Sequence, residues 1–316
     1  MVYVIDTQPI IQSPPTTGLE AAVGNTPLFP LQRLNRDISP RVQVFGKAEW
    51  FNPGGSVKAR PALNIIQSAL AGDCLAGGKR LLDSTSGNMG IAYATFGASF
   101  GIPVTLALPS NASPERIKIL RALGAELILT DPLEGTDGAI QVARQMAEDE
   151  PGRFYYADQY NNPANWRAHF NTTSPEIVYQ TAGRITHFVA GLGTSGTLTG
   201  VAQHLRQFNP QVEIIAVQPD GPFHGLEGLK HMQTALQPGI YDASVPDRMI
   251  EISTETAYAY ARSLARQEGL FVGVSAGAAA AAAVQVAAAR DEGMVVTVLP
   301  DAGYKYLSED LWEDPV

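Results

Sequence analysis

Short runs of β-forming residues alternate with helical patterns from Val42 onward, and this alternation limits the possible fold more than any other feature. The β-rich runs are VQVFGKAE, RLLDS, VTLALP, ELILT, RFYYAD, THFVAG, EIIAVQP and MVVTVLP. Helical stretches lie between them. In SPERIKILRALG, for example, Ser113 can cap a helix, Pro114 fits its first position and Gly124 ends it. Because strands separated by helices usually pair in parallel, the pattern predicts an α/β fold with mostly parallel sheet.

The aromatic and polar segment FYYADQYNNPANW interrupts this alternation near residue 160. A chain of 316 residues is long enough for two domains of medium size. We therefore expect the chain to cross between two α/β units near this segment. Two such units that face each other would form a cleft.

The composition indicates a soluble globular protein, because 45% of the residues are hydrophobic and 17% are charged. A net charge of -9 without a run of Lys and Arg argues against nucleic acid as a partner. The sequence lacks a signal peptide and a bilayer-spanning segment, so we expect a cytoplasmic protein with no membrane contact. Cys74 is the only cysteine and the five histidines lack ligand spacing, so no metal site is expected.

The glycine-rich stretch GLGTSGTLTG, residues 191–200, follows the run THFVAG and precedes a helical pattern. Its glycines match the dinucleotide fingerprint G-x-G-x-x-G, which would bind an anion at a helix N-terminus. The next strand ends in Gln218, however, where an NAD site needs an acidic residue. A phosphate monoester therefore fits better than NAD, and a purely structural turn is the other alternative. The hydroxyl groups that favour a phosphate belong to Thr194, Ser195 and Thr197.

The stretch GVSAG, residues 273–277, matches the nucleophile elbow of α/β-hydrolases around Ser275. That fold needs a histidine after the serine, and His231 is the last histidine of the chain. The hydrolase interpretation therefore fails. Ser275 either caps the alanine-rich helix that follows or has another role.

The stretch NPGGSVKAR, residues 52–60, predicts a Pro-Gly-Gly turn and a helix that Ser56 caps and that begins near Lys58. The positive end of the helix dipole disfavours a charged lysine there, so the pKa of Lys58 should be lowered. A lysine with a lowered pKa can form a Schiff base. A solvated loop lysine is the alternative.

The motifs NPGGSVKAR, STSGNMGIA, GLGTSGT and GVSAG, in this order, resemble those of fold type II pyridoxal-phosphate enzymes, and most closely those of the cysteine synthases. The similarity covers nearly the whole chain, from VGNTPL at Val23 through QYNNPAN at Gln159 to DAGYKYLS at Asp301. The stretches GRITHFVAGLGTSGT and LQPGIYDAS look like B-type cysteine synthases, a group that includes O-phosphoserine sulfhydrylases.

The resemblance implies two three-layer α/β domains, as in the β subunit of tryptophan synthase, with pyridoxal 5'-phosphate in the cleft between them. Residues 46–155 would form the smaller N-terminal domain. Residues 1–45 and 156–316 would form the larger domain, which carries the phosphate loop. The resemblance also implies a homodimer.

Roles for single residues follow from the resemblance as well. Lys58 would hold the cofactor as a Schiff base and act as the catalytic residue. Asn88 would hydrogen-bond the 3'-oxygen of the cofactor, and Ser275 would meet the pyridine nitrogen. Because a neutral hydroxyl does not keep that nitrogen protonated, elimination of a good leaving group is favoured. The loop that would cup the phosphate consists of Gly193, Thr194, Ser195, Gly196 and Thr197.

The substrate carboxylate would be held by a clamp with Gln159 on its far side. The clamp consists of Thr85, Ser86, Gly87 and Asn88. Two residues depart from the family pattern: Met89 replaces a threonine of the clamp, and Ala59 replaces the aspartate usual after the lysine. Lys230 and His231 align with a basic pair of B-type enzymes. Lys230 would bind an anionic substrate such as O-phosphoserine or thiosulfate, or it is a solvated loop lysine.

The resemblance therefore implies a pyridoxal-phosphate-dependent cysteine synthase, a transferase. It would replace the acetyl or phosphate group of an O-activated L-serine by sulfide or thiosulfate, through an α-aminoacrylate intermediate. Its partners would be small molecules, an amino acid and a sulfur donor. Cystathionine β-synthase and serine dehydratase share these motifs and stay open as alternatives. A non-catalytic binding homologue and an NAD-dependent oxidoreductase are the alternatives from other classes.

Overall fold

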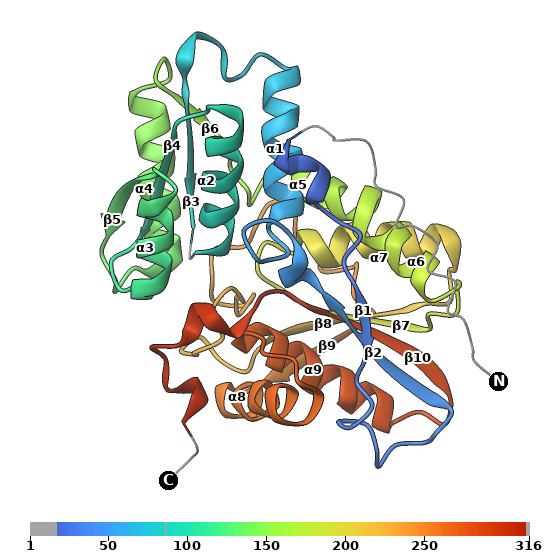
Figure 1. The fold of residues 1–316 in the computed structure, drawn as a ribbon. Helices are drawn as coiled ribbons and strands as arrows, with labels where there is room; N and C mark the ends of the chain where they lie inside the picture. The colour runs from blue at the N-terminus through green and yellow to red at the C-terminus, as the bar shows by residue number, and fades with distance from the viewer. Residues whose placement is uncertain (1–17, 86, 314–316) are drawn as a thin grey trace, which may run out of the picture.

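Within residues 18–85 and 87–313, which the computed structural model describes, the chain forms two β-sheets (Figure 1). The larger sheet has six described strands, and β1 pairs antiparallel with β2 while all other pairs are parallel. Its strands, in spatial order, are β1 (Leu28–Pro30), β2 (Val42–Ala48), β10 (Gly293–Leu299), β7 (His187–Gly191), β8 (Glu213–Pro219) and β9 (Arg248–Ile252).

The smaller sheet has four described strands, and every pair is parallel. In spatial order they are β5 (Glu126–Thr130), β4 (Val104–Pro109), β3 (Arg80–Ser84) and β6 (Phe154–Tyr156). The prediction of an α/β fold with mostly parallel sheet is confirmed, and β3, β4, β5 and β8 begin and end where the sequence predicted. Strands β1 and β9 were missed because both are short edge strands: β1 has three residues and ends in proline, and charged residues interrupt β9.

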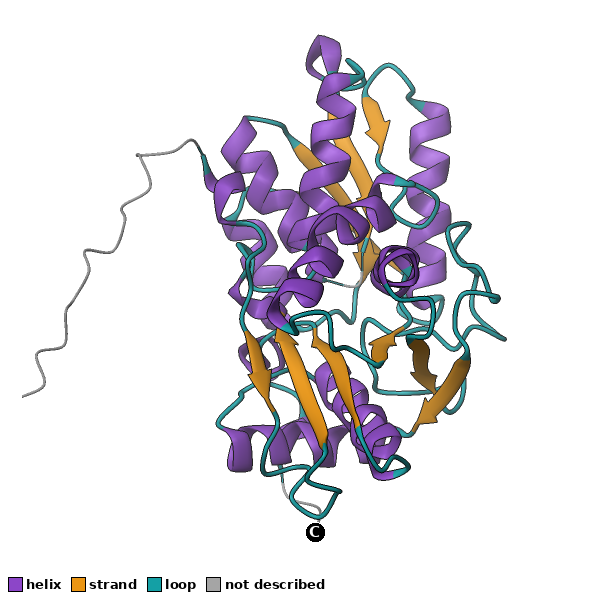
Figure 2. Ribbon diagram, turned by 90° about the vertical axis from the view of Figure 1, so that its right-hand side faces the viewer, coloured by secondary structure: helices purple, strands orange, loops and turns teal. Residues whose placement is uncertain are grey.

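Helices cover both faces of each sheet, so each sheet is the middle of three layers (Figure 2). Helices α8 and α9 pack on one face of the larger sheet and α6 and α7 on the other. Helix α4 covers one face of the smaller sheet, and α1 and α2 cover the other. The helices are α1 (Ala59–Ala71), α2 (Asn88–Phe100), α3 (Pro114–Ala122), α4 (Gly135–Asp149), α5 (Ala164–Ala168), α6 (Ser174–Gln180), α7 (Gly196–Phe208), α8 (Thr254–Ser263) and α9 (Val274–Ala288).

The alanine-rich run forms the middle of α9, which lies buried between the larger sheet and α8. A side chain at Gly277 would come within 2.1 Å of the Ala257 carbonyl oxygen, so the two helix backbones touch there. Small side chains permit this close packing. Among the described residues, no helix has the length and hydropathy needed to cross a membrane.

The two sheets suggest how the chain divides into domains. Strand β2 pairs with β10 along its whole length, from Val42 to Ala48, so residue 46 lies inside a strand of the larger sheet. The four strands of the smaller sheet lie between Arg80 and Tyr156. We propose that the smaller domain begins after β2 rather than at residue 46, and ends after β6, near residue 156.

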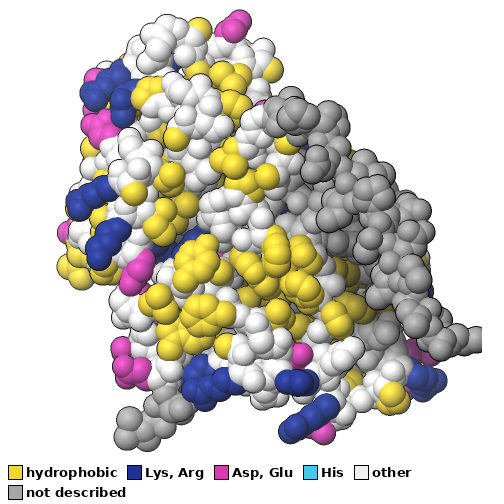
Figure 3. Space-filling view, in the orientation of Figure 1, with side chains coloured by type: hydrophobic (Ala, Val, Ile, Leu, Met, Phe, Trp, Pro, Cys, Tyr) yellow, Lys and Arg dark blue, Asp and Glu magenta, His cyan; other side chains and the backbone are white. Residues whose placement is uncertain are grey.

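Exposed apolar side chains gather on one face of the molecule, where the turn after β2 and the C-terminal turns lie (Figure 3). Phe51 follows β2, and its ring packs at a tilt against those of Phe29 and Trp50. Tyr304 and Leu307 belong to the C-terminal turns. Surface patches of this kind often mark an interface with another protein chain.

A network of buried charges connects the larger sheet to the start of α1. Arg60 donates to Glu49 at 2.7 Å and to Glu176 at 2.7 Å. Lys47 of β2 donates to the second oxygen of Glu176 at 2.6 Å. Burial raises the pKa of Glu176, but its bonds to Arg60 and Lys47 outweigh burial and lower it to about 2. Glu176 therefore stays ionised between Arg60 and Lys47 inside the protein.

We expect Arg60→Leu to lower the free energy of unfolding by about 3–5 kcal/mol, because Glu49 would stay buried without its cation. Chemical denaturation followed by circular dichroism measures this loss. Arg206→Leu is the matched control, since the Arg206 to Asp247 pair is partly exposed and its loss should change stability by about 0–1 kcal/mol. Equal losses in both variants would contradict the structural role of the buried network.

Candidate active site

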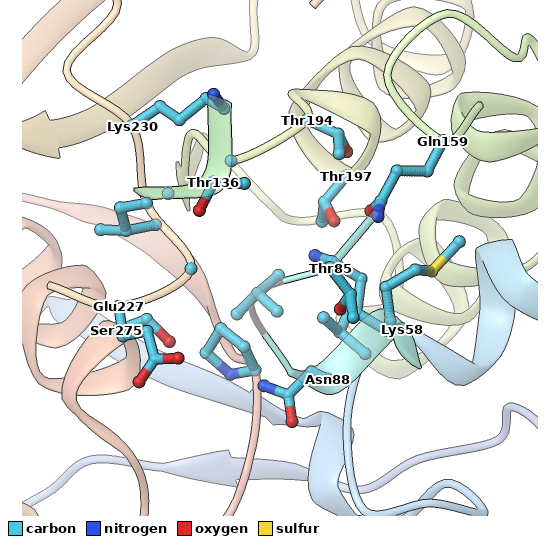
Figure 4. Close-up of a pocket in the computed structure, with 18 of the residues that line it drawn as sticks. Lys58, Thr85, Asn88, Thr136, Gln159, Thr194, Thr197, Glu227, Lys230 and Ser275 are labelled. Atoms are coloured by element: carbon cyan, nitrogen blue, oxygen red, sulfur yellow. The ribbon is translucent and has the colours of Figure 1, made fainter. Parts of the chain in front are cut away.

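A pocket opens between the two sheets, and side chains from both line it (Figure 4). It contains most of the residues that the sequence singled out for the cofactor and the substrate. Of the predicted residues, Ser195, Gly196 and Gly87 do not line it, and Ser86 lies outside the described residues. Those that do are Lys58, Thr85, Asn88, Met89, Gln159, Gly193, Thr194, Thr197, Lys230 and Ser275.

Lys58 directly precedes α1 and points into the pocket. Its backbone N–H donates to Ser56 Oγ at 3.3 Å in the turn before the helix. The predicted helix start near Lys58 is confirmed, but the predicted serine cap is wrong, because Lys58 itself is the N-cap residue and no side chain caps α1. Burial lowers the pKa of the Lys58 amine, and the nearby Asp301 carboxylate only partly offsets this effect. The predicted direction of the shift is confirmed, but its main cause is burial and not the helix dipole. A lysine with a lowered pKa can act as a nucleophile or a base.

The glycine-rich loop, residues 193–197, joins β7 to α7 at the pocket wall. A side chain at Gly193 would come within 2.4 Å of the Gly228 carbonyl oxygen, so only glycine fits. Ser195 has a left-handed backbone with φ 68°. Its Oγ is buried and has no hydrogen-bond partner among the described residues. A strained turn with a spare hydroxyl at a helix N-terminus is suited to an anion.

Two residues that the sequence analysis did not single out form hydrogen bonds that support this loop. Asn165 Nδ2 donates to Thr194 Oγ1 at 3.0 Å. His169 Nε2 lies 3.3 Å from Thr197 Oγ1, and burial keeps the pKa of His169 well below its usual value. Asn165 belongs to the QYNNPAN motif, which was a usable signal, whereas nothing in the local sequence distinguished His169.

Four described helices that carry or follow predicted site residues begin at the pocket, and their positive N-terminal ends meet there; α4 also begins there, with Thr136 in the lining. Asn88 is the first residue of α2, and Ser275 lies in the first turn of α9. Lys58 precedes α1, and the glycine-rich loop precedes α7. Since each free helix N-terminus carries about half a positive charge, the pocket is built for an anion. Within residues 18–85 and 87–313, no cluster of three or more His, Cys, Asp or Glu side chains could hold a metal.

The predicted substrate clamp forms a tight turn between β3 and α2. Thr85 Oγ1 accepts from the backbone N–H groups of Gly87 at 2.9 Å and Gly90 at 3.0 Å. Gln159 Nε2 donates to the Ser84 carbonyl at 2.7 Å, which brings the far side of the clamp against β3. The clamp geometry thus depends on hydrogen bonds within the protein as well as on groups left for a ligand.

Asp83 supports the clamp and was missed by the sequence analysis. It is fully buried and accepts from the backbone N–H groups of Ser84 at 2.8 Å and Gln159 at 3.2 Å. Burial raises the pKa of Asp83 to about 7, although these hydrogen bonds oppose the shift. The single charge inside the apolar run RLLDS was the available signal, because buried carboxylates need a specific reason.

The structure accounts for both departures from the family pattern. Met89 is 3% exposed and packs in the core of the smaller sheet while it also touches the pocket. Ala59 is fully buried in the same core. Arg60 does not need an aspartate beside it, because Glu49 and Glu176 already pair with it.

Lys230 is not a solvated lysine, since it is only 8% exposed. Its Nζ donates to Asp137 Oδ1 at 2.5 Å and lies 5.3 Å from the centre of the Tyr160 ring. Arg116, which the sequence analysis did not single out, also lines the pocket and pairs with Glu227. Both cations at the pocket mouth therefore already have a carboxylate partner.

These features fit pyridoxal phosphate. Lys58 offers an amine of lowered pKa. The loop offers backbone N–H groups at the start of α7 for a phosphate, and no side chain at Gly193 blocks the approach. Asn88 and Ser275 offer neutral hydrogen-bonding groups to the rest of a polar ring.

The comparisons with known proteins agree with this site. The sequence pattern of the family described as "Pyridoxal-phosphate dependent enzyme" matches residues 19–301. The chain is 52% identical to a cysteine synthase of Aquifex aeolicus, over 92% of this chain and 91% of that one. It is 43% identical to cysteine synthase B of Escherichia coli, over 92% and 94% of the two chains.

Solved structures give the same result. The cysteine synthase of Entamoeba histolytica superposes with a TM-score of 0.90 at 35% identity, over 98% of this chain and 95% of that chain. An O-ureido-L-serine synthase superposes with a TM-score of 0.88 at 38% identity, over 96% and 97%. The fold and the site are thus those of a pyridoxal-phosphate-dependent transferase. The chain belongs to the pyridoxal-phosphate-dependent enzyme family and, within it, to the cysteine synthases.

We expect Gly193→Ala to weaken the binding of pyridoxal phosphate at least about fivefold, because overpacking against a backbone atom costs about 1–3 kcal/mol. The added methyl group would meet the Gly228 carbonyl and displace the loop. Fluorescence titration of the cofactor-free protein measures the affinity. In the control Gly152→Ala, the new methyl group meets no described atom within 4 Å. Unchanged affinity in Gly193→Ala would contradict the assignment of the loop to the cofactor phosphate.

Proposed function

We propose that this cysteine synthase uses O-acetyl-L-serine as its acceptor and sulfide as its donor. One observation carries the choice of acceptor: in the described lining of the pocket, each cation apart from Lys58 is paired with a carboxylate. A phosphate dianion would need free cations at this position. An acetyl group is neutral and needs none.

The charge balance of the mouth supports this choice. Arg116 pairs with Glu227, and Lys230 pairs with Asp137. A phosphate group that entered beside these pairs would meet two carboxylates as well as two cations, and the partly desolvated carboxylates would repel it. The substrate carboxylate has a separate place, at the N-terminal end of α2 in the Thr85 clamp.

The cofactor, when bound, supplies the electron sink that acidifies the Cα–H bond of the amino acid. Lys58 Nζ would hold the cofactor and afterwards accept the Cα proton, for which its lowered pKa prepares it. Ser275 would present a neutral hydroxyl to the ring nitrogen, which favours loss of a leaving group. Residues 193–197 would hold the phosphate, and Asn88 would hold the ring oxygen.

The substrate would be oriented by the clamp opposite Lys58. We propose that residues 85–87 bind its carboxylate, with Gln159 on the far side; Thr85 and Gln159 line the pocket. Met89 would contact the substrate through its side chain, which closes one wall of the pocket with an apolar surface. We propose that Lys230 closes the mouth of the pocket by its ion pair with Asp137, and that it does not bind a phosphate group.

The test is the visible absorption spectrum of the holoenzyme during titration with O-acetylserine and, separately, with O-phosphoserine. We expect O-acetylserine to change the spectrum at a concentration at least about tenfold lower than O-phosphoserine does. A tenfold ratio corresponds to a difference of about 1.4 kcal/mol in binding free energy. Addition of sulfide should then restore the original spectrum and release cysteine. The Lys58→Ala holoenzyme should show neither change. A response to O-phosphoserine at the lower concentration would overturn the choice of acceptor.

The pairing of Lys230 can be tested by Asp137→Asn, which frees the lysine charge but keeps an acceptor for the Leu236 N–H group. We expect kcat/KM for O-phosphoserine, relative to that for O-acetylserine, to rise about tenfold, because a charge-assisted bond contributes about 1.5–3 kcal/mol. Steady-state kinetics with both acceptors measure the ratio. Asp149→Asn, an exposed change on the same helix, is the control. If the ratio changes equally in both variants, Lys230 does not govern the acceptor.

We also propose that the protein is a cytoplasmic homodimer. The apolar patch around Phe51 and Tyr304 supports association through that face, and sedimentation should give twice the mass of one chain. A single-chain mass would contradict the dimer. The exposed free thiol of Cys74 supports a reducing compartment.

A further inference from the structure

Lys305 lies in the turn after β10, and its ammonium group is buried without an ion-pair partner among the described residues. The side chain is 1% exposed. Its Nζ donates three hydrogen bonds, all to neutral oxygens: the carbonyls of Gly54 at 2.9 Å and Gly55 at 3.0 Å, and Asn88 Oδ1 at 2.7 Å. The ion pairs of the described residues do not include Lys305, so three carbonyl groups replace the carboxylate that a buried lysine usually has.

This arrangement is energetically unfavourable for the lysine itself. Burial lowers the pKa of Lys305 to about 8, the nearby Asp301 charge opposes this shift, and Arg116 adds to it. A buried ammonium group without an ion pair destabilises a fold unless every N–H group is bonded. All three N–H groups of Lys305 are bonded. We infer that the buried charge is kept because it holds the three acceptors in place.

Two of the acceptors control the start of α1. Gly54 and Gly55 form the turn that precedes Lys58, and both have positive φ angles. Their carbonyl groups converge on Lys305 Nζ. The ammonium group therefore fixes the turn that aims Lys58 into the pocket.

The third acceptor sets the orientation of an amide in the pocket. Asn88 Oδ1 accepts from Lys305, and Asn88 Nδ2 donates to Asp301 Oδ2 at 2.7 Å. A flipped amide would direct N–H groups at an ammonium group and an oxygen at a carboxylate, so both contacts would become repulsive. The orientation of the Asn88 amide is thus fixed, with Nδ2 toward Asp301. Asp301 uses one of the two N–H groups of Nδ2, and the other can bond a group in the pocket.

We propose that Lys305 is a positioning residue for the cofactor, acting through the Asn88 amide and through the turn before Lys58. It presents a fixed N–H donor and a fixed amine before pyridoxal phosphate enters. The proposal deepens the function above and rests on the roles given there to Lys58 and Asn88.

The test begins with Lys305→Met, which keeps an apolar stem and removes all three donors. We expect pyridoxal phosphate to bind the cofactor-free protein about tenfold more weakly, as loss of a charge-assisted bond predicts. The visible absorption maximum of the holoenzyme should also shift. Lys118→Met, on the exposed side of α3, is the matched control and should change neither value. Unchanged affinity and spectrum in Lys305→Met would overturn the proposal. Lys305→Gln replaces the methionine variant if that one does not fold.

A double-mutant cycle with Asn88→Ala tests whether Lys305 acts through the amide. Once Asn88 is gone, Lys305→Met should weaken cofactor binding by a clearly smaller factor than it does alone. Equal factors in the two backgrounds would overturn the proposed route. Affinity and spectrum are measured without any acceptor, so an error in the choice of O-acetylserine leaves this result unaffected. An error in the role of Lys58 appears separately, as a Lys58→Ala holoenzyme whose absorption spectrum, before any acceptor is added, equals that of the unaltered protein.

Discussion

The position of the pocket lysine depends on a buried guanidinium. Arg60 lies two residues after Lys58, and its bonds reach Glu49 in the turn after β2 and Glu176 in α6. Helix α1 itself packs in the core of the smaller sheet. The ion pairs therefore join a helix of one half of the molecule to elements of the other half. Because a guanidinium makes directional bonds to both carboxylates, it restrains the rotation of α1 as well as its position. Lys58 is thus set by groups that do not touch the pocket.

A second constraint is electrostatic and comes from the backbone. Helices α1 and α2 pack against the smaller sheet, and α7 and α9 pack against the larger one. All four begin at the same pocket. Their positive ends disfavour one another and disfavour a charged lysine. A bound anion offsets both effects. Cofactor binding and the relative position of the two sheets are therefore coupled.

The sequence predicted what local pattern determines. Strand positions follow from apolar runs, and the helix starts at Ala59, Gly196 and Val274 follow from short turn motifs. The sequence could not predict contacts between distant segments. Lys305 bonds Asn88 across 217 positions, and Lys230 pairs with Asp137 across 93. No local spacing encodes such pairs, because the folded topology creates them. For the same reason the cause of the Lys58 pKa shift was wrong: burial is a tertiary property and the helix dipole a local one.

The two ends of the pocket differ in whether their cationic side chains are paired with carboxylates. At the inner end, helix N-termini offer N–H groups, and the buried Lys305, which has no ion pair among the described residues, holds Asn88 in place. At the mouth, Arg116 and Lys230 each have a carboxylate partner. Hydrogen bonds therefore stabilise an anion at the inner end. At the mouth an anion would be disfavoured, because it must compete with Glu227 and Asp137 for cations that are already bonded. Discrimination between a neutral and an anionic leaving group then needs no direct contact with that group. The carboxylates that neutralise the mouth would provide the discrimination by themselves, while the cofactor phosphate, held at the other end, is unaffected by them.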